Sequence, residues 1–292
     1  MDSDDSRRKR AAFKQVDVFT AVPFKGNPVA VVLDGNQLTA AEMQSIARWT
    51  NLSETTFVCT PTRDDADYRV RIFTPVSELP FAGHPTIGTA WAVMQHGLTP
   101  KTPGRLVQEC AKGLVALRLV GERVFLALPE PSFVAPDDSG RAGAATALRV
   151  PVGDIVSASI VDVGAIWFTI QLRSAAAVLD LDPDMALVAA HRNGAQTGIC
   201  VFGLYDEGAP SAVEVRAFAP AQGVSEDPVC GSGNGCVAAV IRRQEVLDVS
   251  GYAASQGCRL ARDGRVEVEY DADGTIWLGG TAVTCIDGSI AI

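Results

Sequence analysis

Two turns in the chain combine acidic residues with the start of a helix, an arrangement that suits the binding of an anion. The clearer one lies in residues 216–243, which predict a strand (RAFAP), an acidic and glycine-rich turn (GVSEDPVCGSGNG) and a helix (CVAAVIRR). The first N–H groups of a helix lack partners within the helix, and the helix dipole adds positive charge there. A carboxylate is the simplest ligand. Neither GxxxxGK[ST] nor a well-placed GxGxxG occurs, so a nucleotide is not favoured.

The other turn belongs to an internal repeat. Its string ELPFAGH (78–84) matches EDPVCGS (226–232) at a constant offset of 148 residues. The flanking strings match in the same order, RIFTP (71–75) with RAFAP (216–220) and EMQSIARWTN (42–51) with DMALVAAHRN (184–193). We interpret the repeat as two homologous α/β halves from a duplication, although β-β-α-β units can share this order without common descent. If the halves pack by a pseudo-twofold, the helix starts at Gly83 and Gly231 both face the cleft between them.

The order of expected elements divides the chain into these two halves. Residues 13–130 are expected to form the N-terminal half, and a last strand at about 281–292 can pair with this half again. Residues 148–280 are expected to form the C-terminal half. The segment 131–147 is rich in Pro, Gly, Ser and Ala and predicts a linker. Residues 1–12 are expected to form a disordered tail.

The composition argues against several classes of protein and of site. The chain has 292 residues, 47% of them hydrophobic and 20% charged, and its net charge of −9 makes nucleic acid a poor partner. No apolar run approaches the ~20 residues that cross a membrane, and the charged N-terminus is not a secretory signal. Seven cysteines without a CxxC pair and three dispersed histidines predict no disulfide framework, no metal site and a cytoplasmic location.

Several strings together resemble one family, the phenazine-biosynthesis PhzF-like isomerases. They are QVDVFTAVPFKGNPVAVVL (15–33), NLSETTFV (51–58), RIFTPVSELPFAGHPTIG (71–88) and RAFAP followed by GVSEDPVCGSGNG (216–235). The resemblance implies the α+β diaminopimelate-epimerase-like fold, with two pseudo-symmetric halves, each a mostly antiparallel β-barrel around a central helix. It also implies a cofactor-independent isomerase of a small carboxylate, expected as a homodimer. The family's named member moves a hydrogen within a dihydro-hydroxyanthranilate ring, but membership does not place this chain in phenazine synthesis.

The resemblance assigns roles to residues. Glu54 matches the general acid/base, His84 and Asp227 match polar residues around the substrate, and the amides of Gly83, Gly231 and Ser232 match those that hold its carboxylate. A carboxylate that is partly desolvated has a raised pKa and can take a proton and return it elsewhere. The plain alternatives are a solvated loop acid for Glu54, a structural histidine for His84, a turn residue for Asp227 and a cap for Ser232.

Cys230 departs from the family string, which has threonine there. Related racemases carry a cysteine at each helix start, but the position that matches Cys230 in the first half is Ala82. Cys230 is therefore either a thiol whose pKa is lowered by the helix end or a small residue packed at the turn. The alternatives to a single-base isomerase are an amino-acid epimerase or racemase using Glu54 with Cys230 and a non-catalytic small-molecule-binding protein.

Overall fold

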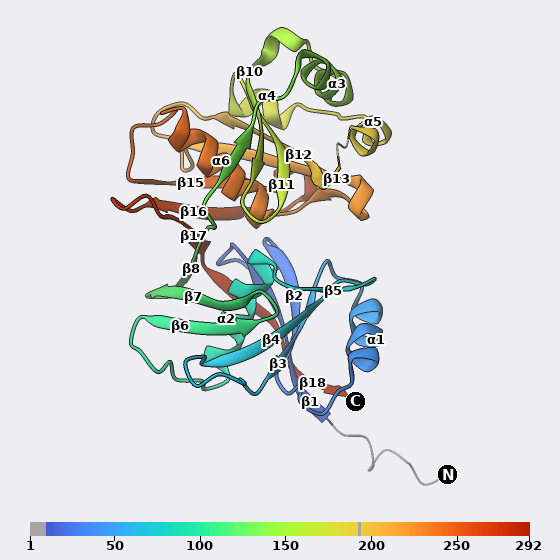
Figure 1. The fold of residues 1–292 in the computed structure, drawn as a ribbon, viewed down its shortest axis with the longest axis vertical. Coiled ribbons are helices and arrows are strands. Elements are labelled where there is room, and N and C mark those ends of the chain that lie inside the picture. The colour runs from blue at the N-terminus through green and yellow to red at the C-terminus, as the bar shows by residue number, and fades with distance from the viewer. Residues whose placement is uncertain (1–9, 192–193) are drawn as a thin grey trace. The chain divides into compact units, whose positions relative to one another are not determined.

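A computed structural model of the chain describes residues 10–191 and 194–292 (Figure 1). The chain forms two compact units, unit 1 with residues 1–126 and 280–292 and unit 2 with residues 127–279. The expected N-terminal half ends at residue 130, four residues after unit 1 does, whereas the expected C-terminal half begins at residue 148, 21 residues after the start of unit 2. Among the helices of the described ranges, none combines the length and the apolar character that crossing a membrane requires.

Unit 1 is a mostly antiparallel β structure with one helix inside it and one outside. Its elements are β1 (Arg10–Val18), β2 (Asn27–Val32), α1 (Ala40–Thr50), β3 (Thr55–Cys59), β4 (Tyr68–Phe73), β5 (Glu78–Leu79), α2 (Gly83–Gln95), β6 (Arg105–Cys110), β7 (Gly113–Val120), β8 (Arg123–Ala127) and β18 (Ala282–Ala291). β1 pairs antiparallel with β18 and β2, β2 runs parallel to β3, and β4 pairs antiparallel with β3 and β5. β6 lies parallel to β4 and begins the antiparallel run β6–β7–β8.

Unit 2 repeats this plan. Its elements are β9 (Ser132–Val134), α3 (Asp138–Leu148), β10 (Ile155–Asp162), β11 (Ile166–Leu172), α4 (Ala175–Leu179), α5 (Met185–Ala190), β12 (Gln196–Leu204), β13 (Val213–Ala219), β14 (Val224–Asp227), α6 (Gly231–Arg243), β15 (Gly251–Gln256), β16 (Gly264–Tyr270) and β17 (Ile276–Gly280). β10 pairs with β9 and β11, β11 runs parallel to β12, and β13 pairs antiparallel with β12 and β14 and parallel with β15. The same order of elements and pairings in both units is the pseudo-symmetric α+β fold that the sequence predicts.

The central helices owe their burial to small and β-branched residues. In α2 nearly every residue from His84 to Val93 is buried, and in α6 nearly every residue from Gly231 to Ile241. A helix that is buried all round must fit between surrounding strands. At Gly88 a β-carbon would overlap Val29 on β2, so only glycine permits this close approach.

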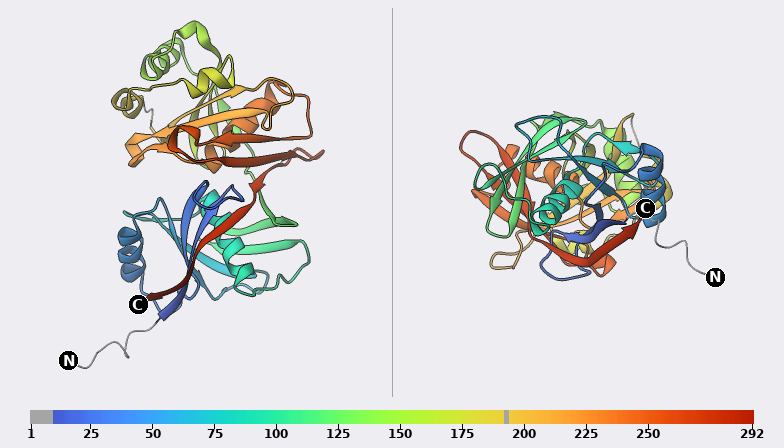
Figure 2. Two further views of the ribbon diagram at one scale, coloured as in Figure 1. Left: turned by 180° about the vertical axis from the view of Figure 1, so that it is seen from behind. Right: turned by 90° about the horizontal axis from the view of Figure 1, so that it is seen from below.

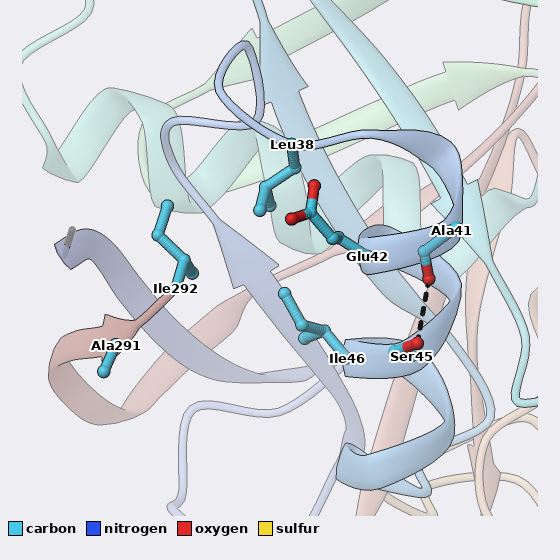
Figure 3. Close-up of a pocket in the computed structure, with 7 residues that line it drawn as sticks. All are labelled: Leu38, Ala41, Glu42, Ser45, Ile46, Ala291 and Ile292. Atoms are coloured by element: carbon cyan, nitrogen blue, oxygen red, sulfur yellow. Dashed lines mark hydrogen bonds between the residues drawn. The ribbon is translucent and has the colours of Figure 1, made fainter. Parts of the chain in front are cut away.

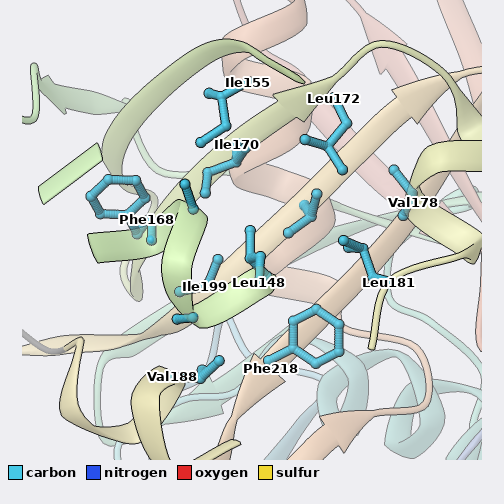
Figure 4. Packing of buried hydrophobic residues seen from close by; sticks show 14 residues of the cluster. Leu148, Ile155, Phe168, Ile170, Leu172, Val178, Leu181, Val188, Ile199 and Phe218 are labelled. Carbon is cyan, nitrogen blue, oxygen red and sulfur yellow. The ribbon is translucent and has the colours of Figure 1, made fainter. Parts of the chain in front are cut away.

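Outer helices cover the other face of each sheet. In unit 1, Met43 and Ala47 of α1 pack against Phe57 and Phe73 of the sheet. A capping box, which the Thr39-x-x-Glu42 pattern predicts, starts α1: Thr39 accepts from the N–H of Glu42, and the Glu42 carboxylate accepts from the N–H of Thr39. In unit 2, helices α3, α4 and α5 build a larger apolar layer over β10 to β13 (Figure 4).

Two sequence expectations about the chain's organisation are wrong. The segment 131–147 is not a linker, because it holds β9 and most of α3, three of whose alanines, Ala144, Ala145 and Ala147, are buried in the core of unit 2. Asp137 caps α3 by accepting from the N–H of Gly140, so a composition typical of loops forms a helix once its small residues pack closely. Residues 10–12 do not belong to a tail, because β1 begins at Arg10 and pairs with β18, whereas residues 1–9 lie outside the described residues.

The helix expected at 184–193 is shorter in the structure than the repeated string DMALVAAHRN predicts. The sequence offers Asp182 or Asp184 as its start. α5 begins after Asp184, whose Oδ1 accepts from the N–H groups of Ala186 and Leu187, and it ends at Ala190. Residues 192 and 193 of the predicted helix lie outside the described residues.

Candidate functional site

In unit 1 the predicted acid and histidine lie side by side at the start of α2. Glu54 occupies the short link between α1 and β3. Its Oε2 lies 3.5 Å from Nε2 of His84, the second residue of α2. That separation is a contact, although it is long for a hydrogen bond.

The surroundings of this pair are mostly dry. The side chain of Glu54 is 16% exposed and that of His84 is 8% exposed. Burial raises the pKa of the Glu54 carboxyl, and the neighbouring Ser53 hydroxyl opposes that rise in smaller measure. A carboxyl whose pKa lies above its ordinary value suits the transfer of a proton in both directions near neutral pH.

The start of α2 has no side-chain cap. Its N-cap residue is Ala82, whose side chain accepts no hydrogen bond, and Pro85 in the first turn has no N–H to satisfy. Gly83 is half-buried, and a β-carbon added there would meet only Leu126, at 3.8 Å from Cδ2. The fold therefore leaves room at Gly83, and α2 presents first-turn amides that no side chain of its N-cap occupies.

Polar contacts along α2 hold the helix in its barrel. Gln108 on β6 donates to Oγ1 of Thr86 at 3.0 Å and accepts from the hydroxyl of Tyr68 on β4 at 2.9 Å. One turn later, Thr89 donates to Thr56 on β3 at 2.8 Å. All of these groups are buried, so their hydrogen bonds fix the orientation of the helix.

In unit 2 the predicted residues gather around the start of α6. Asp227 ends β14, and its Oδ1 accepts from the N–H of Val229 at 3.0 Å. Cys230 is the N-cap of α6 and accepts from the N–H of Gly233 through its sulfur at 3.3 Å. Ser232 is not a cap, since its Oγ accepts from the indole N–H of Trp167 at 2.9 Å. Neither Gly231 nor Ser232 has its amide in a hydrogen bond to the described part of the chain.

The thiol of Cys230 is not activated. Cys230 is 3% exposed, and burial raises the pKa of its thiol well above the usual value, with the charge of Asp227 and the neighbouring Cys200 adding to the effect. Of the two alternatives for Cys230, a thiol pKa lowered by the helix end is the one that this burial disfavours. The alternative, a small packed residue at the turn, describes Cys230 as the structure has it.

Sequence reasoning missed Gln256, whose side-chain amide holds this turn by hydrogen bonds. Oε1 of Gln256 on β15 accepts from the N–H of Cys230 at 3.0 Å and from the side-chain amide of Asn234 at 2.8 Å. Nε2 of Gln256 donates to the carbonyl of Asp227 at 2.8 Å. The repeat could have identified Gln256 from the sequence. At the offset of 148 residues, Gln256 matches Gln108 and Asn234 matches Thr86.

Strand pairing identifies which residue of unit 2 stands in the place of Glu54. In unit 1, Thr55 of β3 pairs with Phe73 of β4, and in unit 2, Ile199 of β12 pairs with Phe218 of β13. Phe73 and Phe218 are equivalent in the repeated strings, so Thr55 and Ile199 are equivalent too. The residue before Ile199 therefore stands where unit 1 carries its glutamate.

That residue is Gly198, and it is buried. A β-carbon there would overlap the carbonyl oxygen of Phe218 and would lie 3.1 Å from the Cα of Ala219. The second unit thus has no space for a base at this position, and the repeat provides a glutamate in one unit only.

Two other features lie apart from these residues. A pocket of about 300 Å³ lies between α1 and the chain end at Ala291 and Ile292 (Figure 3). Its one acidic side chain, Glu42, belongs to the capping box. Within the described ranges, no three His, Cys, Asp or Glu side chains converge as a metal ion would require.

Known proteins resemble this chain in sequence and in fold. Residues 16–288 match the family model described as phenazine biosynthesis-like protein. The chain is 41% identical to antisense-enhancing sequence 1 of Schizosaccharomyces pombe, with 95% of this chain and 97% of that protein aligned. It is 34% identical to trans-2,3-dihydro-3-hydroxyanthranilate isomerase of Pseudomonas chlororaphis, with 95% and 98% aligned. The crystal structure of a PhzF family protein from Bacillus anthracis superposes with a TM-score of 0.86 at 26% identity, covering 97% of this chain and all of that one.

Proposed function

The chain belongs to the phenazine biosynthesis-like protein family and is an isomerase of that family, and we propose that it moves one proton within a small carboxylate by means of a single base. The observation that carries the proposal is the buried contact between Glu54 and His84, together with Gly198 at the equivalent place in unit 2. One glutamate with a raised pKa is suited to a reaction in which the same group removes and returns the proton.

The reaction proceeds in two balanced steps. Ionised Glu54 takes a proton from a carbon next to a C=C bond, and the electron pair of the broken C–H bond shifts the double bond by one position. The Glu54 carboxylic acid then gives the proton to the carbon at the far end of the shifted system, which restores the carboxylate. His84, in contact with Oε2 of Glu54, orients the carboxyl and stabilises its charge. No oxidation state changes, so the step calls for no redox cofactor.

In unit 1 we assign recognition of the substrate's own carboxylate to the amide of Gly83, which begins the uncapped helix α2. In unit 2 the amides of Gly231 and Ser232 begin α6 and form a candidate anion site of their own. Amides at a helix N-terminus favour an anion through direct hydrogen bonds and through the dipole. Asp227 lies at the same turn as Gly231 and Ser232 and is, in unit 2, an acidic group suited to accept a polar hydrogen of a bound molecule.

The substrate class follows from chemistry and from relatives. The Pseudomonas chlororaphis relative is named for trans-2,3-dihydro-3-hydroxyanthranilate, a carboxylate. We propose an unsaturated carboxylate with an acidic C–H for this chain. The epimerase alternative, with Cys230 as the second base, is disfavoured because the buried thiol has a raised pKa and Ala82 stands at the matching position.

Hydrogen exchange with solvent tests this proposal. The unmodified chain is incubated in deuterated water with a panel of unsaturated carboxylates, including trans-2,3-dihydro-3-hydroxyanthranilate, and mass spectrometry measures deuterium in the product. Glu54→Gln should lower kcat by about 10²–10⁴-fold, the usual worth of a general base. Glu122→Gln, an exposed glutamate of the same unit in the turn between β7 and β8, is the matched control. Full turnover by Glu54→Gln would contradict the proposal.

A further inference from the structure

A hydrogen bond between two threonine hydroxyls closes the link that carries Glu54. Thr50 is the last residue of α1 and Thr55 is the first residue of β3, so Glu54 lies in the link of residues 51–54 between them. Oγ1 of Thr50 and Oγ1 of Thr55 are 2.7 Å apart. Thr50 uses its hydroxyl hydrogen to donate to the carbonyl of Ala47 at 3.0 Å, so Thr55 is the donor to Thr50. The two ends of the link are thus tied to each other and to the last turn of α1.

The backbone of the link is fixed where it leaves the helix. Asn51 caps α1 in a left-handed conformation with φ 53°, which asparagine tolerates better than most residues. Its N–H donates to the carbonyl of Ala47 at 3.3 Å, the same oxygen that accepts from the hydroxyl of Thr50. The chain therefore leaves α1 in a defined direction before it reaches Glu54.

Strand alternation directs Glu54 and Thr55 to opposite faces of the sheet. Thr55 lies on the face that α1 covers, because its hydroxyl reaches the last turn of that helix. Thr56 faces the other way, and its hydroxyl accepts from Thr89 of α2 at 2.8 Å. Figures 1 and 2 show α1 outside the strands of unit 1 and α2 among them. Glu54 precedes Thr55 by one residue and accordingly lies on the α2 face, where its carboxylate contacts His84.

Unit 2 shows that the scaffold does not need this hydroxyl. Strand pairing makes Ile199 the equivalent of Thr55, and Ile199 packs in the apolar core of unit 2. The residue before it is Gly198, so unit 2 lacks both the hydroxyl and the glutamate at these positions. Thr55 is 0% exposed, and a buried hydroxyl costs free energy unless it is hydrogen-bonded. The hydroxyl of Thr55 thus occurs in the unit that has an acid to position.

We propose that Thr50 and Thr55 are positioning residues that hold Glu54 against His84. The proposal rests on the proposed function and adds two residues that act through the backbone of the link. From this link Glu54 reaches Nε2 of His84 at 3.5 Å, and an error of about 1 Å in the place of a catalytic group can cost about 100-fold in rate. Burial is the main cause of the raised pKa of Glu54, so a link that opens to water also lowers that pKa.

The pKa of Glu54 tests the proposal without a substrate. Carbon-13 NMR of the glutamate carboxyls follows the titration, and Glu54→Gln identifies the signal by its loss. Thr55→Val replaces the hydroxyl by a methyl group of similar size. It should lower the pKa of Glu54 by about one pH unit toward its ordinary 4.5, because the released link admits water. Thr55→Ser keeps the hydroxyl and should retain the raised pKa.

Two comparisons separate positioning from a general loss of stability. Thr50→Val should act as Thr55→Val does, and the double variant should lower the pKa no further, because each change removes the bond between the two hydroxyls. Thr169→Val is the matched control, since Thr169 is a buried threonine of β11 in unit 2 that donates to the carbonyl of Trp167 at 3.4 Å. This control should lower the Tm and leave the pKa of Glu54 unchanged.

Turnover gives a second readout for each unsaturated carboxylate that takes up deuterium. Thr55→Val should lower kcat about 10–100-fold and leave KM within about twofold, since misplacement of the base affects the reaction more than binding. The acid limb of kcat/KM should move to lower pH together with the pKa of Glu54. If Thr55→Val does not fold, Thr50→Val, at a half-buried residue, carries the same tests.

Two results would overturn the proposal, an unchanged pKa of Glu54 in the folded variants of Thr50 and Thr55 or an equal fall of that pKa in Thr169→Val. Deuterium incorporation that requires Glu54 but ignores Thr50 and Thr55 would overturn this inference alone. A pKa that depends on Thr50 and Thr55, without deuterium incorporation into any carboxylate, would instead overturn the proposed isomerisation and leave the positioning of Glu54 standing.

Discussion

The starts of α2 and α6 come from the same repeated string, yet the two units surround them differently. Both units share a support. Arg71 and Arg216 each form two parallel hydrogen bonds to a glutamate, Glu78 and Glu226, on the short strand that leads to the helix. Each arginine also lies over the phenylalanine two residues later, with 5.2 Å and 5.0 Å to the ring centroids. The repeat thus preserves the device that positions each helix start.

The difference lies in the chemistry at those starts. Unit 1 places Glu54 and His84 at a helix that lacks a side-chain cap, whereas unit 2 has Gly198 and Ser232 at the matching positions and a helix capped by Cys230. We infer that the two copies of the repeat have separate tasks, proton transfer in unit 1 and a firmly hydrogen-bonded anion site in unit 2. A duplicated fold can keep its scaffold while its two sites diverge.

The largest effect should come from breaking the buried support in unit 2. The side chains of Arg216 and Glu226 are 5% and 9% exposed, and Arg216 also donates to the carbonyls of Val178 and Leu181. Glu226→Ala should lower the free energy of unfolding by about 3–5 kcal/mol, because it leaves a buried charge without its partner. The matched change Glu78→Ala, at a pair that is 28% and 37% exposed, should cost about 0–1 kcal/mol. Urea unfolding measures both, and similar losses would contradict the contrast.

The next largest difference should come from adding a methyl group to one glycine in each unit. Gly198→Ala places a β-carbon against the backbone of β13 and should destabilise the fold by about 1–3 kcal/mol. Gly83→Ala has room beside Leu126, so its Tm should stay close to that of the unmodified chain while the KM for a carboxylate substrate rises. A lower Tm in Gly83→Ala with unchanged KM would show that Gly83 serves the fold and not the ligand.

The pH dependence of stability should reveal the buried carboxyl of unit 1. The pKa of Glu54 is raised in the folded chain above its ordinary 4.5, so its stabilising contribution is complete below that pH and is lost as pH rises through the folded value. Glu54→Gln should therefore be more stable than the unmodified chain at pH 7.5, and the difference should shrink below about pH 4.5. The acid limb of kcat/KM should lie above the pH of an ordinary glutamate. An equal effect of Glu54→Gln on stability at both pH values would contradict the assignment.

The smallest effect should come from the cap in unit 2. Cys230→Ala removes the acceptor of the Gly233 N–H and should cost about 0.5–2 kcal/mol, whereas Cys230→Thr retains an acceptor and should cost less. Both variants should keep kcat within a few-fold, because the thiol has a raised pKa and does not act as a base. A large fall in kcat with unchanged stability in Cys230→Ala would instead make the thiol a participant in the reaction.

The sequence alone determined the two-part fold and most of the residues at the helix starts. The repeated strings fixed the equivalence of Gly83 with Gly231 and of Ala82 with Cys230, since a constant offset needs no coordinates. The capping box at Thr39 follows from a local pattern, because caps depend on residues three or four apart. For α5 the local pattern offers Asp182 or Asp184, and the structure has Asp184 as the cap.

Only the tertiary structure decided the features that depend on distant parts of the chain. Small residues in the segment 131–147 form α3 because the sheet of unit 2 gives them a surface to pack against. Burial sets the pKa of Glu54 and of Cys230, and no string of neighbouring residues reveals how much water a fold removes. Tertiary structure also decides that Gly198 has no room for a side chain. The atoms in the way belong to β13, which comes later in the sequence and pairs with the strand of Gly198.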